Sequence, residues 1–485
     1  MPHALSQTSL LTSQRATAAL DARYVMSAEA MADEAVRDPA PQGGLRSRLL
    51  RGSAFEMIGY GLSQLIRFGS NLALSRLLFP EAFGLAALVN ILNQGLVMIS
   101  DVGLPTVIVQ SERGDDPRFL NTAFTWGAGR AVVLWLIASA CAIPMAFLYH
   151  EPQLKLLVPF GSLSVLILGL KSTGYLTLRR RLHLAPLMML EVASQVAAVL
   201  AMIAWASFDK SVWALVLGTV VSALVTMVGS HMLPVGYRNR FEWDRESARS
   251  MFDFGKWVAG SSMLTFASGQ GDRLLLGQFM GAGTLGVYSI AVFLSGALGE
   301  AITRITHGVF FPAYSRVRDE GLPRLRQVFY STRLAVDALV IPALGGLTVL
   351  GPTVVKLIYD NRYFDAGWML RVLSVRVAIA ALSAPYQFCL FAIGESRYGF
   401  FLNLARTIAL VVGVFVGYQL GGIAGLVWGV TFSEIPALLV VFIGFVRHGL
   451  ASPLHELRVP VFYAAGAGLG YLCLLVLHHF GLAAA

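Results

Sequence analysis

The chain has 485 residues, of which 56% are hydrophobic and 13% are charged, with a mean hydropathy of +0.66 and a formal net charge of +9. Soluble domains carry about 25% charged residues, so this composition excludes an ordinary soluble protein and indicates a membrane protein. Basic loops facing anionic headgroups account for the positive charge, and we expect no nucleic-acid partner. Cys141, Cys389 and Cys473 lie in separate apolar segments without histidines at ligand spacing, so we expect no disulfide, metal or other cofactor.

The first 45 residues mix Ser, Thr, Ala and charged residues without the apolar core of about 7 to 15 residues that a signal peptide contains. They are too polar to span a bilayer or to build a core. We therefore expect a disordered cytoplasmic tail.

Long apolar segments recur after residue 50, and each is long enough as a helix, at about 1.5 Å per residue, to cross a hydrocarbon core of about 30 Å. They are continuously apolar, which favours helices over the alternating strands of a membrane barrel. The sequence predicts an all-α polytopic membrane protein with about 12 to 14 spans. We assign thirteen: 53–78, 83–110, 119–148, 154–177, 186–207, 211–233, 252–279, 285–312, 328–350, 367–394, 398–419, 423–447 and 457–481.

Arginines concentrate in every second connection between these spans. By the positive-inside rule, these connections and the amino terminus lie in the cytoplasm, and thirteen spans place the carboxyl terminus outside. Residues 351–366 are expected to form a half-buried outer segment. The basic groups are Arg46 to Arg51, Arg113 and Arg118, Arg179 to Arg181, Arg238 to Lys256, Arg316 to Arg326, Arg397, and Arg447 with Arg458.

A shift of 202 residues aligns Arg76 to Leu88 with Gln278 to Ile290 without a gap and superposes Gly84 on Gly286. Both segments join two spans on the outer side, which is typical of an internal repeat. The repeat predicts two six-helix halves around a central cavity. The expected parts are 50–235, a basic linker at 236–251, 252–450, and an extra helix at 455–485.

Several segments resemble the polysaccharide and O-antigen flippases, the Wzx-type branch of the multidrug/oligosaccharidyl-lipid/polysaccharide (MOP) exporter superfamily. They occur in the usual order of that family from about residue 50 to the end. The segments are "LALSRLLFPEAFGLAALVNILNQGLVMISDVGLPTVIVQ", "YLTLRRRLHLAPLMMLEVASQ", "VWALVLG", "FDFGKWVAGSSMLTFASGQGDRLLLGQFMGAGTLGVYSIA" and "FFPAYSRVRDE".

The resemblance implies alternating access by two helix bundles and translocation of an undecaprenyl-diphosphate-linked oligosaccharide for exopolysaccharide or O-antigen synthesis. The implied partners are this anionic lipid-linked substrate, membrane lipids, and a polysaccharide polymerase with its co-polymerase. Two alternatives remain. One is an exporter of lipid II or drugs, and the other is a membrane-embedded polymerase or ligase, for which only the segment with Asp360, Arg362 and Asp365 has room. We do not expect an enzyme, and the sequence contains no P-loop for ATP.

Ionisable groups inside spans cost about 2.5–3.5 kcal/mol each, so they are expected to face a cavity or a partner. Cations outnumber acids within the spans, which favours an anionic substrate, because arginine pairs its donors with phosphate oxygens. Arg67 stands mid-span with polar neighbours at i−3 and i+4. The predicted cavity residues are Arg67, Gln64, Asn71, Arg130, Lys171 and Arg406.

Four further charged residues are expected to have structural or gating roles: Asp101, Asp272, Glu300 and Arg304. Glu300 and Arg304 have the i, i+4 spacing of an ion pair on one helix. Asp101 is placed in the cytoplasmic half of the second span beside a kink at Gly103 and Pro105. We expect it to form a salt bridge with the basic loop that carries Arg113 and Arg118. Arg273, the neighbour of Asp272, is expected to extend toward the lipid headgroups.

Overall fold

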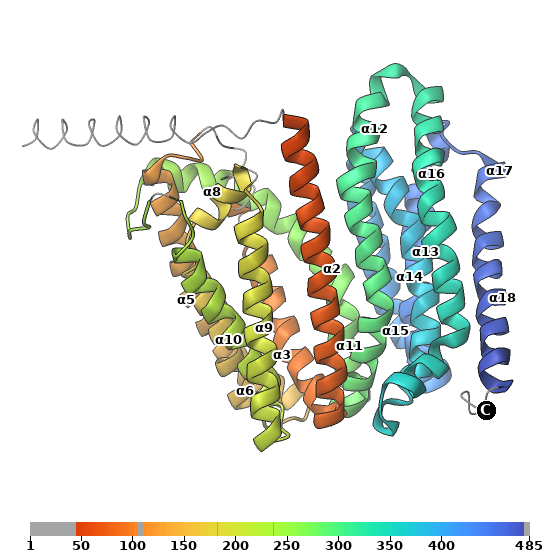
Figure 1. Ribbon diagram of the computed structural model, residues 1–485, viewed down its shortest axis with the longest axis horizontal. Helices are drawn as coiled ribbons and strands as arrows, with labels where there is room; N and C mark the ends of the chain where they lie inside the picture. The colour runs from red at the N-terminus through yellow and green to blue at the C-terminus, as the bar shows by residue number, and fades with distance from the viewer. Residues whose placement is uncertain are drawn as a thin grey trace, which may run out of the picture. The chain divides into compact units, whose positions relative to one another are not determined.

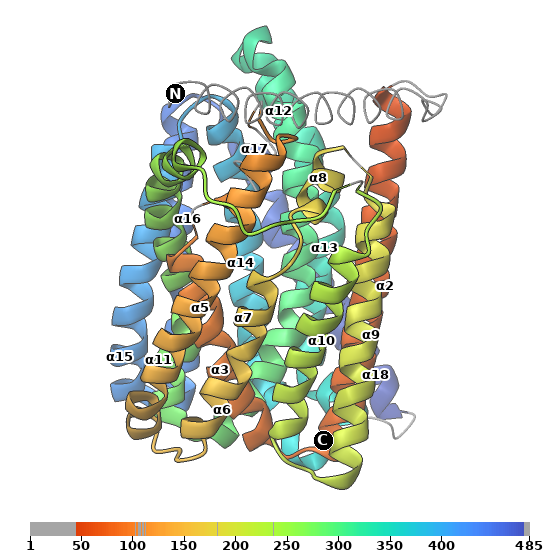
Figure 2. The same ribbon diagram turned by 90° about the vertical axis from the view of Figure 1, so that its left-hand side faces the viewer.

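Every regular element in the described part of the computed structural model is a helix (Figures 1 and 2). The structure describes residues 45–479 except 102, 105–107, 109, 110, 112, 182 and 236, and it leaves the side chains of 45–58, 253–259, 261, 307 and 454 undescribed. The account below concerns residues 55–485, which form one unit by their contacts. The predicted tail before Leu45 lies outside the described residues.

The first group of helices begins with α2 (Leu45–Leu77) and α3 (Pro80–Ile99). Proline occupies the first turn of α3, α5 and α9, where its missing N–H removes no helical hydrogen bond. The fourth crossing is broken, with a 60° bend between the run Leu154–Gly169 and Gly174–Arg180. The remaining helices are α5 (Pro117–Leu148), α6 (Leu154–Gly161), α7 (Leu163–Gly169), α8 (Gly174–Arg180), α9 (Ala185–Phe208) and α10 (Trp213–His231).

Helix α11 (Arg245–Ile305) is two antiparallel limbs joined at Gly281, whose φ of 71° is readily available only to glycine. The Tyr288 hydroxyl donates to Asp272 Oδ2 across the hairpin at 2.9 Å. The second limb continues through the π-helix η1 (Thr306–Phe310) and α12 (Phe311–Val317) to the 3-10 turn η2 (Arg318–Glu320).

The later helices contain a second hairpin, in α15 (Arg397–Phe432), at Gly421 and Gly422. Its limbs approach closely, because a Cβ on Gly413 would lie 2.6 Å from the Gly429 carbonyl oxygen. Small residues of this kind let backbones pack closely in membranes. The other elements are α13 (Leu322–Ile358), η3 (Asn361–Tyr363), α14 (Ala366–Ala392), α16 (Glu434–Arg447), α17 (Pro453–Glu456) and α18 (Arg458–His479).

Nine helical runs of the described chain are long and apolar enough to cross a membrane, and the bent pair adds a tenth. Two of the nine, Ser262–Glu320 and Arg397–Arg447, contain the hairpins and so cross twice. With the bent pair these runs make twelve crossings, and α2 covers the first of the thirteen spans that the sequence predicts. The predicted all-α membrane fold is confirmed.

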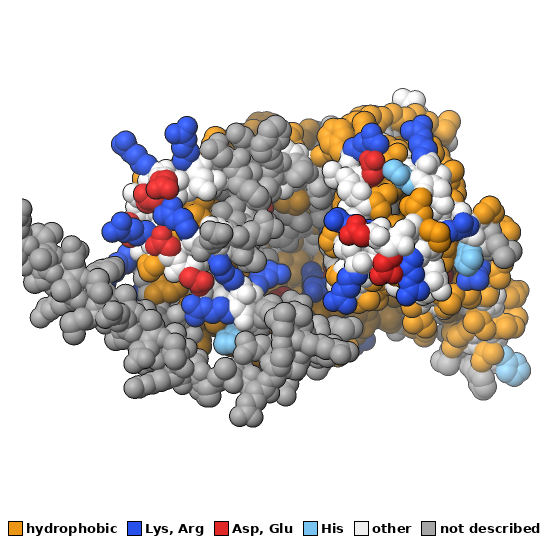
Figure 3. Space-filling view, turned by 90° about the horizontal axis from the view of Figure 1, so that it is seen from above, with side chains coloured by type: hydrophobic (Ala, Val, Ile, Leu, Met, Phe, Trp, Pro, Cys, Tyr) orange, Lys and Arg blue, Asp and Glu red, His pale blue; other side chains and the backbone are white. Residues whose placement is uncertain are grey.

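The helices run between two ends that differ in charge. The end with α8, α12 and α17 is called the basic end, and Lys and Arg side chains gather there in Figure 3. The opposite end, with the turns at Gly281 and Gly421, is called the turn end. The largest buried core joins helices from both parts of the chain and includes Leu78, Leu285 and Tyr363.

Two predicted boundaries are wrong. The second span was expected to reach residue 110, but α3 ends at Ile99, and the Gly103 amide donates to Asp101 Oδ1 at 2.9 Å in the turn that follows. The Ser100 amide donates to the Leu96 carbonyl at the end of α3, and Gly103 adopts a φ of 64° beyond this cap. Pro105, predicted to kink this span, lies outside the described residues. At the other site, Pro352 does not begin an outer segment but lies inside α13, which continues to Ile358.

Candidate functional site

A cavity of about 890 Å³ lies between α2, α3, α9 and α10 on one side and both limbs of α11 on the other. Gln64, Arg67 and Asn71 share one face of α2, because they are three and seven residues apart on a helix. All three line the cavity. The structure thus brings these predicted residues together, and their contact with a substrate remains a prediction.

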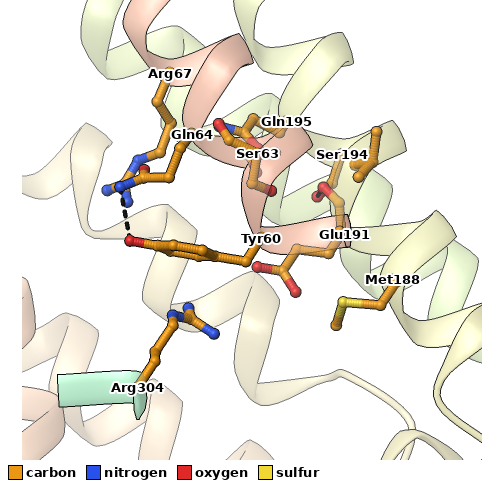
Figure 4. Close-up of a pocket in the computed structure, with 12 residues that line it drawn as sticks. Tyr60, Ser63, Gln64, Arg67, Met188, Glu191, Ser194, Gln195 and Arg304 are labelled. Carbon is orange, nitrogen blue, oxygen red and sulfur yellow. Dashed lines mark hydrogen bonds between the residues drawn. The ribbon is translucent and has the colours of Figure 1, made fainter. Parts of the chain in front are cut away.

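A second hollow of about 330 Å³ continues from the cavity, sharing Gln64, Arg67, Gln195 and Ser222 with it. Figure 4 shows its lining, with Tyr60 of α2 above Arg304 of the second α11 limb. The Arg304 guanidinium lies 3.9 Å from the centre of the Tyr60 ring, within the range of a cation–π contact. Glu191 of α9 also faces this hollow. Sequence analysis did not assign Tyr60 or Glu191 to the site.

Glu300 is bound by α2 and not by its helical neighbour. Its Oε2 accepts hydrogen bonds from the Tyr60 hydroxyl at 3.3 Å and from Gln64 at 3.4 Å. It lies 3.9 Å from Arg67 Nη1, and about half of each of these two charged side chains is exposed. The predicted Glu300–Arg304 pair is wrong, because Arg304 stacks on Tyr60 instead.

Cations exceed acids around the joined cavities. Their charged residues are Arg67, Arg273 and Arg304 against Glu191 and Glu300, which leaves one net positive charge. Arg273 Nη1 donates to Gln270 Oε1 at 3.0 Å, and both residues face the cavity. Arg273 therefore lines the cavity. The prediction that its side chain extends toward the headgroups is wrong. The arrangement can attract an anion and still donate several hydrogen bonds.

Three other predicted residues meet in a separate pocket of about 330 Å³ between α3, α5 and α7, lined by Asp101, Arg130 and Lys171. Arg130 Nη1 donates to the Ser100 carbonyl at 3.0 Å and lies 3.8 Å from Asp101 Oδ1. The salt-bridge partner of Asp101 is therefore Arg130, and the prediction of Arg113 or Arg118 is wrong. Lys171 Nζ lies 3.8 Å above the Tyr175 ring. Neither cation lines the central cavity.

Arg406, the last predicted cavity residue, belongs to a buried charge network in the later helices. Asp272 Oδ2 lies 2.7 Å from Arg376 Nη1, and Arg376 Nε lies 3.3 Å from Glu434 Oε1. Arg406 Nη2 lies 2.8 Å from Glu434 Oε2. The exposed fraction of these side chains is at most 18%, so the ions stabilise one another out of water. Asp272 is thus paired within this network, and its structural or gating role remains a prediction.

The turn end is closed by the segment between α13 and α14. Arg362 donates to the carbonyls of Ser75, Arg76 and Leu78 at 3.2–3.4 Å, and these are carbonyls at the end of α2 that lack helical partners. The Tyr363 hydroxyl also donates to the Leu78 carbonyl, at 2.9 Å. The signal in the sequence was the group of Asp360, Arg362 and Asp365 in this outer connection, which was weighed only as an enzyme site.

Two further contacts support this closure. The Tyr359 hydroxyl donates to Asn71 Oδ1 at 2.6 Å, which links the closing segment to the cavity wall. At the exposed turn itself, hydrogen bonds from the Arg362 side chain and the Asn361 amide lower the pKa of Asp360 below its ordinary value. The Asp360 carboxylate therefore stays charged and holds Arg362 in place.

Residues 73–367, more than half of the chain, match the family described as polysaccharide biosynthesis protein. The chain belongs to the polysaccharide biosynthesis protein family. Among curated relatives of this family member, the lipopolysaccharide biosynthesis protein WzxC of Escherichia coli K12 is 22% identical, covering 82% of this chain and 79% of WzxC. The succinoglycan biosynthesis transport protein ExoT of Rhizobium meliloti is 24% identical, covering 71% of this chain and 69% of ExoT. The predicted family resemblance is confirmed.

Solved structures agree on the fold of this polysaccharide biosynthesis protein. The lipid II flippase MurJ in an inward closed conformation superposes with a TM-score of 0.66 at 9% identity, covering 87% of this chain and 99% of MurJ. An inward-facing multidrug resistance MATE transporter of the MOP superfamily superposes with a TM-score of 0.60 at 14% identity, covering 82% of this chain and 95% of the transporter. The chain has the MOP fold.

Proposed function

We propose that this protein is an inner-membrane flippase that moves an undecaprenyl-diphosphate-linked oligosaccharide from the cytoplasmic to the outer leaflet. The observation that carries the proposal is the cavity lined by Arg67, Arg273 and Arg304 in a member of the polysaccharide biosynthesis family. A diphosphate is a double anion with oxygens spaced for paired donors, which arginine supplies.

The polar groups around these arginines suit the other part of the substrate. Gln94, Asn90 and Gln195 line the cavity beside Gln64 and Asn71. Amide side chains both donate and accept, so they can exchange hydrogen bonds with sugar hydroxyls. The prenyl chain can remain in lipid, which keeps its apolar surface out of the cavity.

The closed turn end and the cavity together support alternating access. The cavity lining continues toward the basic end at Tyr60, Met188 and Arg304, whereas Arg362 and Tyr363 bind α2 at the turn end. By the positive-inside rule the basic end faces the cytoplasm. The structure then corresponds to the loading state, and transport requires the two six-helix halves to separate at the turn end.

Transport accounts for the outer segment better than catalysis does. The polymerase or ligase alternative placed its site at Asp360, Arg362 and Asp365. In the structure Arg362 is engaged with Asp360 at 2.8 Å and with the end of α2, so its role is closure. A polymerase and co-polymerase acting after this protein would consume the translocated repeat unit.

The experiment is complementation of a deletion in the bacterium that encodes the chain. Arg67→Ala should abolish surface polysaccharide at unchanged protein level, and Arg316→Ala, an exposed arginine outside the cavity, should restore it fully. Arg67→Lys tests the need for a paired donor and should restore it in part. Normal polysaccharide with Arg67→Ala, accompanied by lost drug resistance, would favour a drug exporter and overturn the proposal.

A further inference from the structure

A smaller pocket of about 220 Å³ opens beside the central cavity, between the second limb of α11 and α14. The two spaces share Val292 and Gly296 in their walls, so the pocket adjoins the cavity. Small side chains form much of its wall, among them Ser295, Gly299 and Ala380. They leave room where larger residues would fill the space between two packed helices.

Charged groups line one side of this pocket. Arg376 uses Nη1 to bind Asp272 and Nε to bind Glu434. Among the described residues Nη2 of Arg376 has no hydrogen-bond acceptor, so it can donate to a ligand. The hydroxyl of Thr303 donates to the Gly299 carbonyl and keeps its lone pairs as acceptors. The pocket therefore offers both a donor and an acceptor to hydroxyl groups.

We propose that this pocket binds one sugar ring of the translocated glycan, an inference that rests on the proposed function. At about 30 Å³ for a water molecule in the liquid, 220 Å³ corresponds to roughly seven waters, which is room for one sugar ring.

The charge of the groups around the pocket indicates which part of the substrate binds there. The network around the pocket contains two arginines and two carboxylates and is neutral, so it does not favour the diphosphate. A prenyl unit would bury the Arg376 donor without a partner, which is costly. A neutral sugar supplies that partner, and the pocket thereby discriminates between repeat units.

Gly296 gives a direct test, because it lines both the pocket and the cavity and a Cβ added there meets no atom within 4 Å. Gly296→Leu should occupy the space without disturbing the backbone, and leucine has a higher helix propensity than glycine. Gly269→Leu is the matched control, since Gly269 lies in the other limb of α11 with open space at its Cβ and does not line this pocket.

The measurement is equilibrium binding to the purified full-length protein of two probes. One is the undecaprenyl-diphosphate-linked repeat unit extracted from the bacterium that encodes the chain, and the other is undecaprenyl diphosphate without sugars. Gly296→Leu should weaken binding of the glycosylated probe by at least about tenfold and that of the bare probe several-fold less than this. Gly269→Leu should leave both unchanged.

Each other outcome has a distinct meaning. If the wild type binds neither probe, the proposed function fails. If the wild type binds the glycosylated probe and Gly296→Leu binds it equally well, the sugar pocket is wrong. Equal weakening of both probes, or weakening of the bare probe alone, would assign the space to the diphosphate or the prenyl chain and would also overturn the inference. Melting temperatures of the two variants check that both are folded.

Discussion

Gly84 and Gly286 make reciprocal contacts at the turn end. A Cβ on Gly84 would lie 1.9 Å from the Ala282 carbonyl oxygen, and a Cβ on Gly286 would lie 1.8 Å from the Pro80 carbonyl oxygen. Both pairs obey the same offset, since 286 − 84 and 282 − 80 are each 202. The two contacts are thus what a two-fold relation between the α2–α3 and α11 turns would produce. They support the predicted repeat.

Gly84→Ala should therefore destabilise the closed turn end. No side chain fits against a backbone oxygen at this distance, and overpacking costs about 1–3 kcal/mol. We expect a lower melting temperature in detergent for Gly84→Ala. The matched control is Gly69→Ala in α2, where an added Cβ meets nothing within 4 Å. Equal melting temperatures for the two variants would contradict the close packing.

Arg362→Ala should open the turn end toward the cavity. Hydrogen bonds to charged groups are worth about 1.5–3 kcal/mol and 1.4 kcal/mol is a factor of ten, so we expect at least a roughly tenfold shift in population. The readout is labelling of Leu74→Cys, buried in the cavity wall, by a membrane-impermeant maleimide in a chain whose three native cysteines are serine.

Lys155→Ala is the charge control for this labelling experiment. Lys155 is exposed near the turn end and lies 5.7 Å from the centre of the Phe147 ring, and among the described side chains it makes no ion pair with α2. With Lys155→Ala, the labelling rate of Leu74→Cys should equal that in the parent chain. An unchanged rate for Arg362→Ala would show that Arg362 does not hold the turn end closed.

Two arginine variants should differ in their effect on the free energy of unfolding. Arg376→Met breaks a buried pair and leaves the Asp272 carboxylate without its ion-pair partner, which costs about 3–5 kcal/mol, so the yield of folded protein should fall sharply. Arg67 is half exposed and 3.9 Å from its partner, so Arg67→Met should cost about 0–1 kcal/mol. Thermal unfolding followed by size-exclusion chromatography measures both. A larger loss for Arg67→Met would reverse these assignments.

The start of α11 should respond to acid through Asp244. Hydrogen bonds from the Ser247 hydroxyl and amide hold the pKa of Asp244 below its ordinary value. A lowered folded pKa stabilises the helix start above the unfolded pKa of about 4, and this contribution is lost as the pH falls through the folded value. Hydrogen exchange at residues 247–250 should quicken below about pH 4, relative to its intrinsic rate.

Asp244→Asn supplies the comparison for that measurement. Asparagine is as good an N-cap as aspartate but does not titrate, so the variant should keep its protection and lose the acid response. The same acid response in both proteins would assign it to another group.

The sequence predicted the helical spans because their lengths and hydropathy are properties of single segments. Gln64, Arg67 and Asn71 were also predicted correctly as neighbours, since one helix determines their spacing. Glu300 and Arg304 satisfied the same rule and were still misassigned, because Tyr60 and Arg67, which bind them, come from a helix more than 230 residues away in the sequence. Partners across helices are set by packing, which one sequence does not display.

Asp101 and Arg406 show the same limit. The sequence indicated that each needs a partner in the membrane, and each has one, in Arg130 and Glu434. Which cation meets which acid depended on where α3 ends and on how α15 packs on α16. The closing role of Arg362 likewise required the position of the end of α2.

The central claim is tested most directly by translocation in proteoliposomes. The purified chain is reconstituted with an undecaprenyl-diphosphate-linked repeat unit labelled on its glycan, and movement between leaflets is followed by quenching from outside. The wild type should exchange the lipid faster than empty liposomes, and Arg67→Ala should be slower by about tenfold or more, since a charge-assisted hydrogen bond is worth about 1.5–3 kcal/mol. Exchange no faster than in empty liposomes, or an equal rate for Arg67→Ala, would contradict a flippase that carries its substrate through this cavity.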